Sequence, residues 1–99
     1  MIIRSVTFHE LAEQELLDAA HYYENQSAGL GFAFLEGIEH AVAQICEHPE
    51  STYQISPLVR RKIVRRFPYS IMYSVQDDRI RILAIANQRR RPFYWRGRR

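Results

Sequence analysis

The residues best suited to chemistry lie in the last twelve positions of the chain, the tail 88–99. Six of these twelve residues are arginines and three, Phe93, Tyr94 and Trp95, are aromatic. Guanidinium groups bind phosphates through paired hydrogen bonds, and aromatic rings stack on bases or on other guanidinium planes. The alternative is that the aromatic residues pin the tail onto the body of the protein while the arginines stay in solvent. We favour this second interpretation for the aromatic residues.

The positive charge of the tail belongs to a split that runs through the whole sequence. Residues 1–57 hold one basic and nine acidic residues, a net charge of −8, whereas residues 58–99 hold thirteen basic and two acidic residues, a net charge of +11. Attraction between the two halves would use some of these charges, but the basic residues outnumber the carboxylates. The sequence therefore predicts a basic surface that faces phosphates or an acidic partner. Its candidate target-binding residues are Arg60, Arg61, Lys62, Arg65, Arg66, Arg89, Arg90, Arg91, Trp95 and Arg96.

An acid–base reaction on this surface would have few residues to use. Residues 58–99 contain no histidine and no glutamate, so a proton would have to pass through Lys62, an arginine or a tyrosine such as Tyr69, Tyr73 or Tyr94. The pKa values of these groups lie well above neutrality in water, whereas general acid–base catalysis favours values near the working pH. A dense arginine cluster could lower such a pKa, so catalysis is an alternative that the composition disfavours.

Metal and cofactor sites are not expected. The four histidines all lie in the acidic half and lack the spacing of a shared metal site. Gly29 and Gly31 are interpreted as turn residues, because no strand leads into them as it would into a phosphate-binding loop. The single cysteine, Cys46, is interpreted as a small core residue and fits a reducing cytoplasm. No apolar run is long enough to cross a membrane, so we expect a cytoplasmic protein without a membrane partner.

Hydrophobic periodicity predicts the helices that must position the basic residues. Residues 2–8 alternate as in a strand, and apolar residues then recur every three or four positions over 8–23, which predicts a helix. Turn residues at 25–29 separate it from a second helix, expected over 30–47, that stops before Pro49. A short connection between two amphipathic helices predicts an antiparallel hairpin.

The second half of the chain changes to the period of strands. Its expected elements are a basic strand at 60–67, a kink at 67–69, a strand at 70–75, a turn at 76–79 and a strand at 80–87. Residues 82–86 are apolar on both faces, so the last strand should lie in the middle of the sheet. The order of elements predicts an α+β fold: an N-terminal strand, an antiparallel two-helix hairpin and a three-stranded antiparallel meander, with the helices packed on one face of the sheet. The pairing of the first strand stays open.

Taken together, these segments resemble the RelE/ParE toxin superfamily. In the acidic half the similar residues are Phe8-x-x-x-Ala12, Glu15-Leu16, Tyr22-Tyr23-Glu24, Gly29-Leu30-Gly31, Phe34-Leu35 and His48-Pro49. In the basic half they are the run from Arg65 to Tyr73 and the close of the chain, Arg89-Arg90-Arg91-Pro92-x-Tyr94-Trp95-x-x-Arg98. The resemblance covers essentially the whole chain and implies a single toxin domain, 1–99, with the basic aromatic tail at 88–99. It also implies a type II toxin–antitoxin (plasmid stabilisation) system, in which a cognate antitoxin wraps the toxin and blocks its working surface.

Two mechanisms compete within that superfamily. RelE-like members cut messenger RNA in the ribosomal A site, and Arg89, Tyr94 and Lys62 would be the catalytic candidates here. ParE-like members have lost that set and inhibit DNA gyrase. Arg89 and Tyr94 partly match RelE-like residues, but Ser70 stands where RelE-like enzymes tend to carry an arginine, and Asn87 where close relatives often carry a histidine. We therefore favour ParE-like inhibition of gyrase over ribosome-dependent cleavage of messenger RNA. A nucleic-acid-binding module without toxicity is a third alternative, which the charge split permits and the resemblance argues against.

Overall fold

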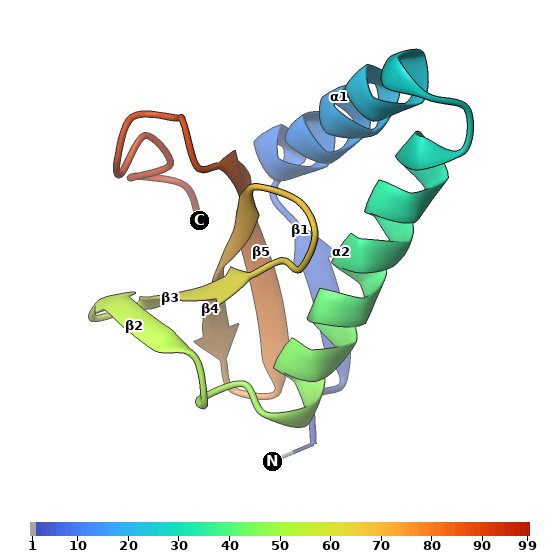
Figure 1. Ribbon diagram of the computed structural model, residues 1–99. Helices are drawn as coiled ribbons and strands as arrows, with labels where there is room; N and C mark the ends of the chain where they lie inside the picture. The colour runs from blue at the N-terminus through green and yellow to red at the C-terminus, as the bar shows by residue number, and fades with distance from the viewer. Residues whose placement is uncertain (1) are drawn as a thin grey trace.

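The computed structural model describes residues 2–99 and shows a five-stranded sheet with two helices on one face (Figure 1). The elements are β1 (Ser5–Phe8), α1 (Glu10–Gln26), α2 (Leu30–Glu47), β2 (Tyr53–Ser56), β3 (Val59–Ile63), β4 (Tyr69–Gln76) and β5 (Arg79–Asn87). The strand order is β1-β5-β4-β3-β2, with β1 parallel to β5 and every other pair antiparallel. The α+β fold predicted from the sequence is confirmed. Met1, the first residue of the expected domain, lies outside the described residues.

The sheet nevertheless has more strands than the sequence predicted. β2 was not expected, because its residues are largely exposed and do not alternate clearly, and it extends the meander to four strands. The basic strand expected over 60–67 ends at Ile63. The chain turns there because the N–H of Val64 donates to the carbonyl of Tyr69, and because Arg66 adopts a left-handed backbone with φ of 73°. The first strand, whose pairing the sequence left open, lies beside β5.

The two helices are joined by a tight connection in which one side chain caps the second helix. The carboxylate of Glu24 accepts hydrogen bonds from the N–H groups of Gly29, at 3.0 Å, and Gly31, at 3.1 Å. Gly29 has a φ of 88°, which a glycine adopts without steric cost. The interpretation of Gly31 as a turn residue was wrong, because Gly31 lies inside α2. A Cβ there would be 2.5 Å from the carbonyl oxygen of Ala20, so the absence of a side chain lets the helices approach closely.

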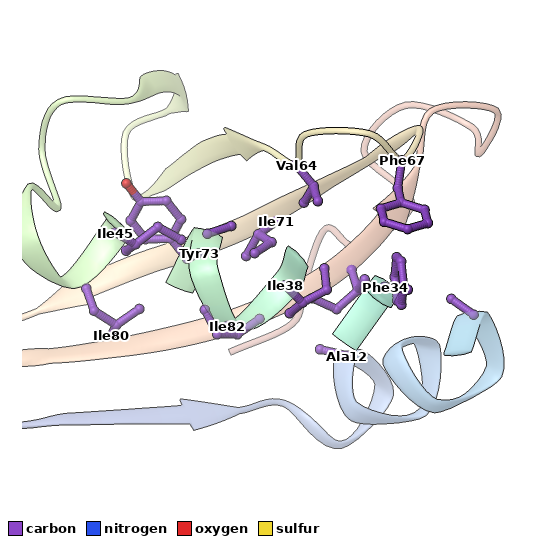
Figure 2. Close-up of a cluster of buried hydrophobic side chains, with 13 residues drawn as sticks. Ala12, Phe34, Ile38, Ile45, Val64, Phe67, Ile71, Tyr73, Ile80 and Ile82 are labelled. Atoms are coloured by element: carbon purple, nitrogen blue, oxygen red, sulfur yellow. The ribbon is translucent and has the colours of Figure 1, made fainter. Parts of the chain in front are cut away.

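The main hydrophobic core lies between the helices and the sheet (Figure 2). From α2, Phe34, Ile38 and Ile45 point into it, as the predicted apolar stripe requires. The sheet contributes residues such as Ile71 from β4 and Ile82 from β5. Every residue of the apolar run 82–86 is buried, and β5 is an interior strand between β1 and β4, although β4 is the middle strand of the five.

The opposite face of the sheet, here called the open face, carries no helix. The tail folds over part of it (Figure 1). Trp95 is 6% exposed and packs with a second apolar cluster from the strands, which comprises Val59, Met72, Leu83, Ala84 and Ala86. The interpretation that aromatic residues pin the tail is therefore confirmed for Trp95, whereas Phe93 beside it stays 44% exposed.

Candidate functional site

The tail leaves the sheet through a turn built on Asn87, the last residue of β5. Its side-chain oxygen accepts a hydrogen bond from the N–H of Arg89 at 2.8 Å, and its carbonyl accepts one from the N–H of Arg90 at 3.0 Å. Asparagine favours such turns because its side chain imitates a backbone carbonyl. Asn87 therefore begins the turn that sets the direction of the arginine run.

A groove of about 450 Å³ lies on the open face between the tail and strands β3 and β4. Its apolar surface includes Met72 and Trp95, and three arginines line it: Arg61, Arg90 and Arg91. No aspartate or glutamate lines the groove. We call this hollow the basic groove. Ser70 also lines it and is 6% exposed, so an arginine at this position would enter the groove from its floor.

A second groove, of about 500 Å³, lies on the other side of Trp95. It is lined by apolar residues that include Leu58 and Val59, and by Arg96. Leu58 is 80% exposed, so this part of the open face presents apolar surface to solvent. Trp95 thus stands between two hollows that each carry at least one of the predicted target-binding arginines.

Most of the positive charge of the second half has no carboxylate partner. Within residues 2–99 two ion pairs form, between Arg4 and Asp78 and between Arg98 and Glu15. Attraction between the acidic and basic halves therefore involves direct pairing at Arg98 alone among the thirteen basic residues of 58–99. Arg60 and Arg81 donate to main-chain oxygens of the chain itself, and the other basic side chains keep their charge available for a partner.

The remaining predicted target-binding residues do not join the basic groove. Lys62, Arg65 and Arg66 line a hollow against α2, on the helix side of the sheet. Arg60 donates from Nη1 to the carbonyl oxygens of Glu50 and Thr52, at 3.0 and 2.7 Å, and so braces the chain between α2 and β2. Arg89 is exposed at the Asn87 turn. The ten residues predicted as one surface are thus divided among several places.

Tyr94 is held between two guanidinium groups. The Cζ atom of Arg90 lies 3.9 Å from the centre of its ring and that of Arg98 lies 5.1 Å from it. Its hydroxyl is buried and forms no hydrogen bond of normal geometry among the described residues, although the carboxylate of Glu15 lies near it. Burial contributes most to the raised pKa of Tyr94, and Glu15 raises it further, first as a nearby hydrogen-bond acceptor and then through its negative charge, although Arg90 and Arg98 act in the opposite sense. The phenol is therefore neutral at physiological pH.

The other two tyrosines considered for proton transfer, Tyr69 and Tyr73, pack in or against the main hydrophobic core. Tyr73 is fully buried, and its hydroxyl donates to the carbonyl of Pro49 at 2.7 Å and also bonds the hydroxyl of Thr52. Burial raises the pKa of Tyr73 as well. Tyr69 packs against the rings of Tyr23 and Phe34 on the helix side. Neither side chain faces the basic groove.

Two residues that fix the tail were missed from the sequence. Glu15 of α1 and Arg98 of the tail form an ion pair whose side chains are 15% and 12% exposed. The sequence suggested that the tail arginines stay in solvent, and for Arg98 this was wrong. The available signal was a glutamate beside the apolar stripe of the first helix, next to Leu16, but nothing local names its partner 83 residues away.

The described residues form neither a metal-binding cluster nor a membrane-spanning helix. Within residues 2–99, no three histidine, cysteine, aspartate or glutamate side chains are grouped so that they could hold a metal ion. None of the helices in the same range is both long and apolar enough to span a membrane.

The fold and the basic groove define a small α+β protein whose candidate binding surface is an arginine-lined sheet face crossed by its own C-terminal tail. A family model described as the ParE toxin of the type II toxin–antitoxin system parDE matches residues 6–92. The chain therefore belongs to the ParE toxin family, which confirms the resemblance seen in the sequence. The match ends before Tyr94, Trp95 and Arg98, the residues that dock the tail.

Structural comparison agrees with this assignment. A chain of a solved structure titled "Chromosomal ParDE TA system from P. aeruginosa" is similar to this one, with a TM-score of 0.61 and 20% sequence identity. The likeness covers 86% of this chain and 96% of that chain, and it supports the fold. No curated protein matches the sequence.

Proposed function

We propose that this chain is the toxin of a type II toxin–antitoxin pair, that it inhibits DNA gyrase by binding, without cutting nucleic acid, and that a cognate antitoxin neutralises it. The family assignment supports the toxin part of this proposal. The mechanism rests on the residues that would be needed for cleavage.

The observation that carries the proposal is the state of Tyr94. A tyrosine that takes part in RNA cleavage must present its hydroxyl to the substrate, because proton transfer requires hydrogen-bond distance. Tyr94 lines the basic groove, but its hydroxyl is buried and its pKa is raised, so the phenol does not present its proton to the groove and does not ionise near neutrality. Lys62 lies on the helix side of the sheet and Arg89 is exposed at the turn. The three cleavage candidates are therefore not gathered around one substrate position.

The basic groove supports binding instead. Arg61, Arg90 and Arg91 line it without a carboxylate, beside an apolar floor. Guanidinium groups form strong paired hydrogen bonds with phosphate and carboxylate alike. Gyrase bound to DNA offers both kinds of group, so one groove of this chemistry is suited to that complex.

The open face also suits an antitoxin segment. Leu58, Ile63 and Tyr53 are 80%, 58% and 67% exposed, and Arg61 lies over the ring of Tyr53 at 5.3 Å. An acidic, amphipathic segment would cover these apolar side chains and neutralise arginines at the same time. Hydrogen exchange of the complex with the product of the adjacent reading frame should protect residues 58–99 more than the outer surfaces of α1 and α2. Protection confined to residues 9–47 would contradict this.

The direct test is supercoiling of relaxed plasmid by purified gyrase in the presence of the chain. We expect inhibition, and we expect Arg90→Ala to require about tenfold more protein, a loss typical of one charged contact at an interface. Arg79→Ala is the matched control, since Arg79 is exposed at the far end of β5 and lines none of the three hollows. Equal effects of the two substitutions would remove the basic groove from the proposal.

Ribosome-dependent cleavage of messenger RNA is the competing mechanism, and Tyr94→Phe separates the two. In a binding inhibitor this substitution should leave gyrase inhibition within about twofold, because the ring and its two guanidinium contacts are kept. In a nuclease that uses the hydroxyl, cleavage should fall by about 10²–10⁴-fold. Codon-linked cuts in ribosome-programmed messenger, lost in Tyr94→Phe, would overturn the gyrase mechanism. Ser70→Arg should not create cleavage, since a guanidinium alone does not expose the phenol.

A further inference from the structure

Two side chains complete the edge of β5 beyond the end of β1. The pairing of β1 with β5 stops at Ile82, so the following backbone groups on that edge have no strand beside them. The N–H of Ile85 donates to Oε1 of Glu15 at 3.0 Å, and Nη1 of Arg98 donates to the carbonyl of Leu83 at 3.0 Å. The helix and the tail thus meet on the backbone of β5.

At this meeting point the two charges also bind each other in two-point fashion. Nη1 of Arg98 lies 3.0 Å from Oε1 of Glu15, and Nη2 lies 3.2 Å from Oε2. Both side chains are largely buried. Paired hydrogen bonds between a guanidinium and a carboxylate fix orientation as well as distance, and removing one partner leaves the other buried and unpaired. The position of Arg98 is therefore set by Glu15.

A stack of side chains leads from Arg98 to the basic groove. The ring of Tyr94 lies between Arg98 and Arg90, and the Arg90 guanidinium is the closer of the two. Arg90 in turn lines the groove, where its charge has no carboxylate partner. A guanidinium on the face of an aromatic ring is held there by the ring quadrupole. The contacts thus run from Glu15 through Arg98 and Tyr94 to Arg90, and the Glu15 carboxylate also lies near the Tyr94 hydroxyl.

We propose that Glu15 is a positioning residue of the toxin: by anchoring Arg98 it fixes the ring of Tyr94, which aims Arg90 into the basic groove for the target. Glu15 itself does not touch the groove, since it lies on α1 at the edge of β5. The target contact rests on the proposed function, whereas the placement of Arg90 does not. These two parts are tested by different measurements.

The placement is tested by NMR of the isolated full chain. Protons of the Arg90 side chain lie over the Tyr94 ring and should show an upfield ring-current shift. Glu15→Gln keeps an oxygen that can accept from Ile85 but loses the charge that holds Arg98, so it should return Arg90 to its ordinary shift. Glu13→Gln is the matched control, an exposed glutamate of the same helix. If Glu15→Gln does not fold, Arg98→Gln removes the other partner of the same ion pair. This variant should fold, because the tail that carries residue 98 can move into solvent.

The consequence for the target is tested by a double-mutant cycle in the gyrase assay. Glu15→Gln alone should raise the inhibitory concentration about fivefold, and in an Arg90→Ala background by less than about twofold, because interacting residues lose their effect together. A merely structural role of Glu15 would instead give the same factor in both backgrounds.

Each outcome decides one statement. An Arg90 ring-current shift that persists in Glu15→Gln or Arg98→Gln overturns the positioning role, whatever the target is. Equal factors in the cycle overturn it as well. If the unsubstituted chain does not inhibit gyrase, the proposed function fails, and the NMR measurement still decides whether Glu15 places Arg90.

Discussion

The two faces of the sheet are covered by very different parts of the chain. Two long helices cover one face with apolar residues at regular helical spacing. The core between these helices and the sheet includes seven large side chains that are almost completely buried: Phe34, Ile45, Ile71, Tyr73, Ile80, Ile82 and Ile85. A short irregular tail covers the other face, where Trp95 is the one tail residue of the buried cluster. The core on the first face is almost completely buried, although one hollow lies against α2 on that side, whereas the second face leaves two grooves open beside the tryptophan.

This difference separates stability from recognition. Burial of apolar surface on the helix side is the main favourable term for folding, so that face tolerates little change. Binding residues in proteins are often carried by irregular segments that a rigid scaffold supports, and the tail is such a segment. The comparison predicts large effects on stability from the helix face and small ones from the tail, with the reverse order for target binding.

The largest loss of stability should come from the helix face. Phe34 is 0% exposed, and Phe34→Ala should lower the free energy of unfolding by ~3–5 kcal/mol, as truncation of a core aromatic residue typically does. Phe32, in the same helix and 66% exposed, is the matched control and should change little. Urea melts followed by circular dichroism measure both. Similar small losses would show that this face is not the main core.

The two glycines of α2 test how tightly the helix face is packed. Gly31→Ala should destabilise by ~1–3 kcal/mol, because its Cβ would meet backbone at 2.5 Å and the helices would have to separate. Gly37→Ala should be neutral or stabilise by up to ~1 kcal/mol, since its Cβ would make ordinary contact at 3.7 Å with Phe67 and alanine favours helix. Thermal melts should therefore show a lower melting temperature for Gly31→Ala and an unchanged or higher one for Gly37→Ala.

On the tail face, Trp95→Ala should release the tail more than it unfolds the protein. We expect a loss below the ~3–5 kcal/mol typical of tryptophan truncation in a core, because the tail can undock while the rest stays folded. Limited trypsin digestion with mass spectrometry should show rapid cleavage after Arg96 and Arg98. Phe93→Ala, with a half-exposed ring, is the control and should be cleaved more slowly.

The smallest effect is expected from alkaline pH, and it should act on the tail. Burial raises the pKa of Tyr94 above its ordinary 10.0, so the folded state favours the protonated phenol. The stability gained in this way is fully present below the unfolded pKa and is lost as the pH rises through the folded pKa. The Trp95 emission maximum should therefore move to longer wavelength above about pH 10. Tyr94→Phe should remove that shift, whereas Tyr22→Phe, at an exposed position of α1, should leave it in place.

Local periodicity explains how much of this fold could be predicted. The second helix has the predicted bounds, Leu30 to Glu47, because its apolar stripe and the following proline are both local signals. The interior place of β5 followed from a run that is apolar on both faces. β2 was missed because a short, mostly exposed edge strand carries no such pattern, and β3 was predicted too long because the turn after it depends on Tyr69, beyond its own sequence.

The candidate site was predictable in composition but not in arrangement. The excess of arginine, the Trp95 anchor and the family were readable from the chain. The alternation of neighbouring residues along β3 then sent Arg61 to the basic groove and Lys62 to the helix side, which a list of basic residues does not reveal.

The sequence by itself determined the helices, the interior strand β5, the imbalance of charge and the family, because each depends on residues that are close together in the chain or on composition. Only the tertiary structure decided which arginine is buried and which hydroxyl is hidden. Arg98 meets Glu15 across 83 residues, and its guanidinium lies 5.1 Å from the centre of the Tyr94 ring. Such contacts join segments with no common local pattern, so the fold must form before their partners are defined.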